Sequence, residues 1–64
     1  MNFYNILIVS VNPETKQEKV IGQIAVSNLL IAQIVKDTLK KDSSFPIYNK
    51  VVIHDPNGRE IMGD

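Results

Sequence analysis

Cysteine is absent from this 64-residue chain, and histidine occurs only once. The first absence excludes disulfides and thiolate metal sites, and the second excludes a metal site built from several histidines of one chain. A chain this short buries little of its surface and usually gains stability from disulfides, a metal or a partner subunit. The sequence therefore predicts no cofactor and favours a homodimer or tight docking onto another protein.

An excess of charge is also missing, since seven basic residues balance seven acidic ones and only one of the basic residues is arginine. A neutral chain has no long-range attraction to nucleic acid or to anionic membranes. No apolar run is long enough to cross a bilayer or to act as a signal core. We expect a single cytoplasmic domain over residues 1–64, without a membrane segment.

Two runs of β-forming residues open the chain. Tyr4–Val11 has four β-branched residues and neither glycine nor proline, so it predicts a strand buried on both faces. Val20–Val26 predicts a second strand, joined to the first by the polar loop 12–19, and its Gly22 marks a bulge or a close approach. With Val11 opposite Val20, one face would carry Leu7, Val9, Val11, Val20, Ile24 and Val26, and the other Tyr4, Ile6, Ile8, Ile21 and Ala25.

A helix is predicted over residues 29–41. Ser27 or Asn28 can cap its start, and the basic pair at 40–41 suits its negative end. Leu29 and Leu30 fall off the main apolar stripe. That stripe, which we expect to face the sheet, consists of Ile31, Ile34, Val35, Thr38 and Leu39.

Two further strands are predicted over 47–54 and 59–62. Between them, Asp55-Pro56-Asn57-Gly58 predicts a type I turn with a glycine bulge. The order is ββαββ, and a right-handed crossover gives an antiparallel α+β sheet of order 2-1-3-4 with the helix on one face. The other face would be left uncovered and would carry Tyr4, Ile6, Ile8, Ile21, Tyr48 and Val52.

Catalytic signals are weak throughout the chain. His54 precedes Asp55, but neighbours in a strand point to opposite faces, and Asp55 is better explained as the residue that opens the turn. The carboxylates lack the spacing of a calcium loop, and the three glycines are too scattered to form a phosphate-binding loop. The sequence predicts no enzyme, and no catalytic, cofactor-binding or metal-binding residue.

The leading interpretation is a small interaction protein, a homodimer that inhibits or regulates another macromolecule by binding its surface. Bacteriophages and mobile elements encode many proteins of this size that lack a cofactor or catalytic signature. By that association, the expected role is inhibition of a host defence or replication enzyme. The alternative is a nucleic-acid-binding or transcription-regulating dimer, with helix lysines paired across a two-fold axis and Tyr4 and Tyr48 able to stack bases. The interface candidates are Tyr4, Ile6, Ile8, Ile21, Leu29, Leu30, Tyr48 and Val52, and the loop candidates are Lys16, Lys19, Asn57 and Arg59.

Overall fold

A computed structural model describes residues 2–62 of the chain, with four strands and one helix in the order ββαββ. The strands pair antiparallel in the order β2-β1-β3-β4, as predicted. No helix within the described residues is both long and apolar enough to span a bilayer. The elements are β1 (Tyr4–Val11), β2 (Glu18–Val26), α1 (Leu29–Lys41), β3 (Lys50–His54) and β4 (Glu60–Met62).

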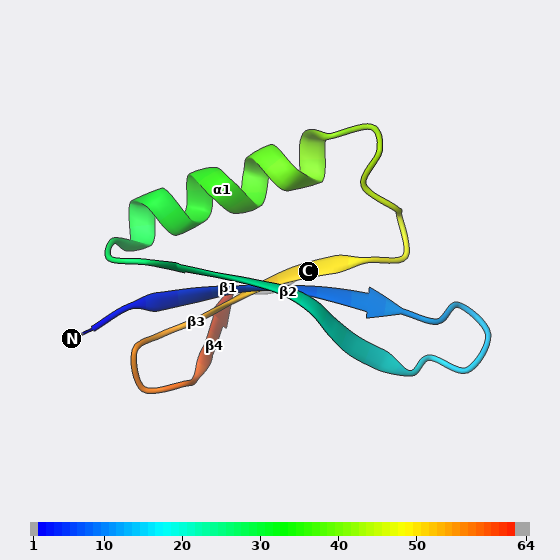
Figure 1. Cartoon of the computed structure of the whole chain (residues 1–64), viewed down its shortest axis with the longest axis horizontal. Helices are drawn as coiled ribbons and strands as arrows, with labels where there is room; N and C mark the ends of the chain where they lie inside the picture. The colour runs from blue at the N-terminus through cyan, green and yellow to red at the C-terminus, as the bar shows by residue number, and fades with distance from the viewer. Residues whose placement is uncertain (1, 63–64) are drawn as a thin grey trace.

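The molecule has two layers, with α1 on one side of the sheet (Figure 1). The helix packs against β1, β2 and β3. The β1–β2 hairpin loop and the connection from α1 to β3 lie at one end of the sheet, and the turn between β3 and β4 lies at the other (Figure 1). The α+β class and the strand order predicted from the sequence are both confirmed.

Local hydrogen bonds fix both ends of α1. Asn28 has an extended backbone, and its Oδ1 accepts from the N–H of Leu30 at 2.7 Å, so it is the residue that caps the helix. At the other end, the N–H of Asp42 donates to the carbonyl of Leu39 at 3.3 Å. The predicted bounds of the helix are confirmed.

The β3–β4 turn is built around Asp55. Its carbonyl accepts from the N–H of Gly58 at 2.9 Å, and its Oδ1 accepts from the N–H groups of Asn57 and Arg59 at 3.0 and 2.8 Å. Gly58 has a φ of 87°, which a side chain would oppose. The sequence prediction of Asp55 as the turn opener and of Gly58 at positive φ is confirmed.

The β1–β2 loop is closed by Asn12. Its Oδ1 accepts from the N–H groups of Glu14 and Thr15, and its backbone exchanges bonds with Lys16 and Gln17 at 2.8 and 2.9 Å. Lys16 has a φ of 64°, in the left-handed region where a non-glycine residue is disfavoured. The loop is therefore a hydrogen-bonded turn.

A bulge in β2 sets which residues face the helix. Ile8 lies opposite Gly22, whereas Val9 lies opposite Val20, so Ile21 is the extra residue. The predicted pairing of Val11 with Val20 is therefore wrong, since Val11 lies opposite Glu18. The bulge reverses the alternation along β2, so Ile24 and Val26 share a face with Ile6 and Tyr4, whereas Ala25 lies opposite Asn5 on the other face.

The core lies between α1 and the face of the sheet that was predicted to be uncovered. Ile6, Ala32, Val51 and Ile53 form a fully buried cluster. Ile8 belongs to the same face, because it lies opposite Val51, and its Cδ1 would lie 3.2 Å from a Cβ added to Gly22. The assignment of Tyr4, Ile6 and Ile8 to an uncovered face is thus wrong. Packed around the cluster are Tyr4, Val26, Leu29, Val35, Leu39 and Phe45.

The third strand is shorter than predicted. Residues 47–49 precede it, and the N–H of Asn49 donates to the carbonyl of Pro46 at 3.0 Å, which makes this segment a turn. Ile47 and Tyr48 consequently lie outside the sheet. The second strand starts two residues earlier than predicted and the fourth strand one residue later.

Candidate interaction surface

Exposed apolar side chains are concentrated in β2 and the first half of α1. Ten large apolar residues are exposed among those described, and six of them lie between positions 20 and 34. We call these six the β2–α1 surface. Its members, with their exposed fractions, are Val20 (54%), Ile21 (55%), Ile24 (38%), Leu30 (64%), Ile31 (47%) and Ile34 (57%).

The helix is apolar on two sides. Leu29, Ala32, Val35 and Leu39 pack toward the core, at the spacing of one helical stripe. On another side, Leu30 and Ile34 are four residues apart and Ile31 and Ile34 are three apart, so the three exposed residues are neighbours. The predicted stripe merged these two sides. Ile31 and Ile34, which were expected under the helix, are exposed, whereas Leu29 is packed against the core.

Strand β2 forms one edge of the sheet, and seven of its nine residues are exposed. Only β1 pairs with it, so the backbone N–H and C=O groups on its outer side have no strand partner within the described residues. No charged residue occurs between Val20 and Val26. The edge is therefore long, apolar and uncharged over most of its length.

The face of the sheet opposite α1 carries Leu7, Val9, Val11 and Val52, and also the exposed Val20, which lies directly opposite Val9. Val9 and Val52 are 5% and 4% exposed, so the centre of this face is already buried within the monomer. Lys50 Nζ lies 2.9 Å from Glu18 Oε2, an ion pair that joins β3 to β2 across β1. Gln23 Nε2 donates to Asn5 Oδ1 at 2.9 Å on the same face. This face is a mixed polar and apolar surface.

The interface residues predicted from the sequence fall into three groups in the structure. Tyr4, Ile6 and Leu29 belong to the core or pack against it, and Ile8 lies on the same side of the sheet. Val52 does lie on the face away from the helix, but it is buried. The residues that remain exposed are Ile21, Leu30 and Tyr48 (55%).

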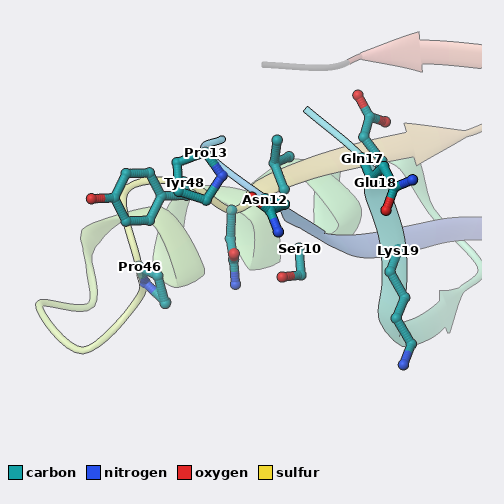
Figure 2. Close-up of a pocket in the computed structure, with 10 residues that line it drawn as sticks. Ser10, Asn12, Pro13, Gln17, Glu18, Lys19, Pro46 and Tyr48 are labelled. Atoms are coloured by element: carbon teal, nitrogen blue, oxygen red, sulfur yellow. The ribbon is translucent and has the colours of Figure 1, made fainter. Parts of the chain in front are cut away.

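A hollow of about 540 Å³ lies at the hairpin-loop end of the sheet. Tyr48, Pro13 and Pro46 lie on one side of it and Glu18 and Lys19 on the other (Figure 2). Its lining combines rings, amides and one charge of each sign, and no pair of side chains in it is arranged for nucleophilic or acid–base chemistry.

The predicted loop residues are all exposed but lie at opposite ends of the molecule. Lys16 and Lys19 belong to the hairpin-loop end, and Lys19 lines the hollow. Asn57 and Arg59 belong to the β3–β4 turn at the other end. The four residues therefore do not form one contact site (Figure 1).

The residues considered for chemistry do not assemble into a site. Both side-chain bonds that Asp55 accepts come from its own turn, so this carboxylate has a structural role. No group of three or more His, Cys, Asp or Glu side chains that could hold a metal is found in the described part of the chain. The backbone N–H of Ser44, and then its hydroxyl, donate to Asp42 Oδ1 and lower the pKa of this exposed carboxyl below its usual range.

The features that favoured nucleic acid are not brought together. Tyr4 packs against the core, whereas Tyr48 lies in the turn before β3, so the two rings do not share an open sheet face. Lys50 is paired with Glu18, and Lys36 and Lys40 also have interaction partners. The described lysines do not form a continuous basic stripe with aromatic residues between them.

Sequence reasoning missed Val20, Ile24, Ile31 and Ile34 as exposed positions. One signal could have found them. The chain contains no charged residue from Val20 to Val35, sixteen consecutive positions that include the end of β2 and the start of α1. An edge strand and an outer helix face normally carry charges that keep them in solvent.

Comparison with known proteins gives no relative for this chain. No family model, curated protein sequence or solved structure matches it. Any function must therefore be argued from the exposed surface itself.

Proposed function

We propose that this chain is a small non-catalytic interaction protein that self-associates through the β2–α1 surface and, as a homodimer, inhibits or regulates another macromolecule by binding it. The observation that carries the proposal is the concentration of six exposed apolar side chains in one uncharged stretch of sequence. Soluble monomers seldom leave such surface in water, and patches of this kind usually mark interaction sites.

The overall shape supports a chain that is completed by a partner. A compact monomer of 7.2 kDa exposes about 4100 Å² on the usual size relation, and this chain exposes 4590 Å². Its radius of gyration is 11.7 Å, compared with about 10.7 Å for a compact domain of this length. Both differences indicate an extended, flat monomer with a small core.

The energy available from this surface is large enough for association. Full burial of a Val, Leu or Ile side chain contributes about 1.5–3 kcal/mol. The six residues are on average about half exposed, so covering them contributes about 5–9 kcal/mol per protomer. The rigid-body cost of association is about 4–15 kcal/mol for the whole complex, which two such contributions offset.

The test begins with the oligomeric state of the unmodified chain. We expect sedimentation equilibrium at micromolar concentrations to give a dimer, and Ile34→Glu to give a folded monomer, because Ile34 is 57% exposed and lies outside the core cluster. Thr38→Glu, one turn further along α1 and also exposed, is the matched control for an added charge. An unmodified chain that sediments as a 7.2 kDa monomer throughout would overturn the proposal.

The regulatory half of the proposal has a separate test. A protein partner captured from cells by the unmodified chain should be lost with a surface variant that leaves the dimer intact. Lys19→Glu at the hollow and Arg59→Glu at the β3–β4 turn are such variants, one for each end of the molecule. A partner retained equally by both variants and by Ile34→Glu would show that none of these surfaces recognises it.

A further inference from the structure

We infer that two copies of this chain join edge to edge through β2, in antiparallel register about a two-fold axis at Ile24, to form one continuous eight-stranded sheet with both helices on the same face. The inference rests on the proposed self-association and specifies its geometry. The occupant of the β2 edge is a second copy of the chain.

The β2 edge fits another β2 edge because no charges would meet. From Gly22 to Val26 the strand has no charged side chain and no proline, and both would hinder pairing. Its carboxyl-terminal half is also the regular half, because the bulge at Ile21 separates it from the charged start of the strand. A free backbone edge of this kind recruits an additional strand through main-chain hydrogen bonds.

The regular segment fixes the register. Pairing Gly22–Val26 with itself places Ile24 opposite Ile24 of the second copy, Gln23 opposite Ala25, and Gly22 opposite Val26. A shift toward the start of the strand would bring in the bulge and then Lys19 and Glu18. A shift toward its end would leave too few residues to pair. Ile24 is therefore the position on the two-fold axis.

The helix supplies the second part of the same contact. It starts three residues after β2 ends and runs back along the sheet (Figure 1). Ile24 lies about 7 Å back from Val26 at the rise of a strand, and Ile31 and Ile34 lie about 3 and 8 Å from the start of α1 at the rise of a helix. Ile24 and Ile34 are therefore at a similar height along the sheet, and Ile31 lies one helical turn nearer the end of β2, so the edge pairing would bring these residues close to their counterparts.

The area involved is that of an ordinary interface. A stable complex takes about 800 Å² from each partner, which is about a sixth of the 4590 Å² that this chain exposes. The stretch from Val20 to Val35 is a quarter of the chain and includes most of its exposed aliphatic residues. One interface would cover both the open strand edge and the outer apolar side of α1.

The absence of cysteine permits a direct test by single-cysteine cross-linking. Directly opposite positions on antiparallel strands have Cβ atoms about 4.5–5.5 Å apart, close to the separation in a disulfide. Under mild oxidation, Ile24→Cys should convert to a covalent dimer at least tenfold faster than Lys19→Cys on the same strand. Ile61→Cys is the matched control in β4, since Ile61 and Ile24 are 42% and 38% exposed.

Hydrogen exchange of the unmodified chain is the second measurement, and it needs no variant. We expect exchange of the amides in 22–26 to slow at least tenfold as the protein concentration rises through the dimerisation range, while those in 60–62 do not change. A dimer that cross-links faster through Leu30→Cys than through Ile24→Cys, without this protection, would overturn the edge pairing and leave the proposed self-association standing. A chain that remains a monomer would overturn both.

Discussion

The two edge strands of the sheet both contain a bulge and begin with a charge, but they differ in length and in how long an uncharged segment they expose. Strand β2 has nine residues, of which seven are exposed, and its last seven carry no charge. Strand β4 has three residues, begins at Glu60, and is bulged where it meets β3. Short length, charge and bulges are the devices by which proteins prevent strand edges from associating.

Only the β4 edge of the sheet is fully protected against pairing by features of the chain itself. The β4 edge offers little backbone for pairing, because the strand has only three residues and follows the hydrogen-bonded turn at Asp55. The β2 edge has a bulge at Ile21 and two charges at its start, which leaves the segment Gly22–Val26 without protection. An asymmetry of this kind is expected when one edge contacts a partner and the other contacts water.

The largest expected effect comes from placing a charge on each edge in turn. Ile24→Lys should raise the dissociation constant of the dimer at least 100-fold, because a desolvated ammonium would face its own copy across the two-fold axis. Ile61→Lys, at a position of similar exposure in β4, should change it less than threefold. Sedimentation equilibrium gives both constants, and circular dichroism checks that each variant is folded. Equal effects of the two substitutions would contradict the asymmetry.

A smaller effect distinguishes Gly22, in the middle of the edge strand β2, from Gly58, in the β3–β4 turn. Gly58 has a φ of 87°, so Gly58→Ala should reduce the free energy of unfolding by about 1–2 kcal/mol, although nothing lies within 4 Å of the added methyl. Gly22→Ala should change it by less than about 0.5 kcal/mol, because the end of the Ile8 side chain can move and alanine is less flexible in the unfolded state. Urea unfolding at one fixed protein concentration measures both, since the stability of a dimer depends on concentration. A larger loss for Gly22→Ala would mean that Ile8 is held rigidly over β2.

The smallest effect involves Asp42, which lies on neither edge. Its folded pKa is lowered by bonds from Ser44, so the carboxylate stabilises the folded state above its ordinary pKa of 3.8. That contribution is lost as the pH falls through the lowered folded value. Asp42→Ala should therefore reduce the melting temperature slightly at neutral pH, by less than Gly58→Ala does, and the difference from the unmodified chain should vanish in strong acid. Thermal scans from neutral pH downward test this, and a difference that grows in acid would contradict the assignment.

Features encoded by neighbouring residues were predictable from the sequence. The bounds of β1 and α1, the Asn28 cap and the turn at Asp55 each depend on hydrogen bonds or propensities within a few positions. The strand order also followed, because the handedness of the crossover leaves few alternatives. These features needed no knowledge of which surface is buried.

The faces could not be predicted, because they depend on contacts between distant segments. Strand β1 is apolar on both sides, so its pattern does not say which side meets α1. The register of β2 also matters, because the extra residue at Ile21 reverses which side chains of β2 point to each face of the sheet. Likewise, α1 is apolar on two sides, and only packing reveals that Leu29 and Ala32 are the buried pair while Ile31 and Ile34 are exposed. Of the eight interface residues predicted from the sequence, only Ile21 and Leu30 consequently belong to the exposed β2–α1 surface.

The brevity of β4 has a consequence for how far assembly can proceed. Val20–Val26 is a seven-residue uncharged segment rich in β-branched residues, the composition of segments that stack without limit into cross-β fibrils. The proposed edge pairing through β2 uses the same edge of both copies, so the resulting sheet would end in two β4 strands of three residues each. Neither end can template another copy. In the proposed dimer, polymerisation would therefore stop at two copies, and the segment most prone to form fibrils would be enclosed at the centre of a finite assembly.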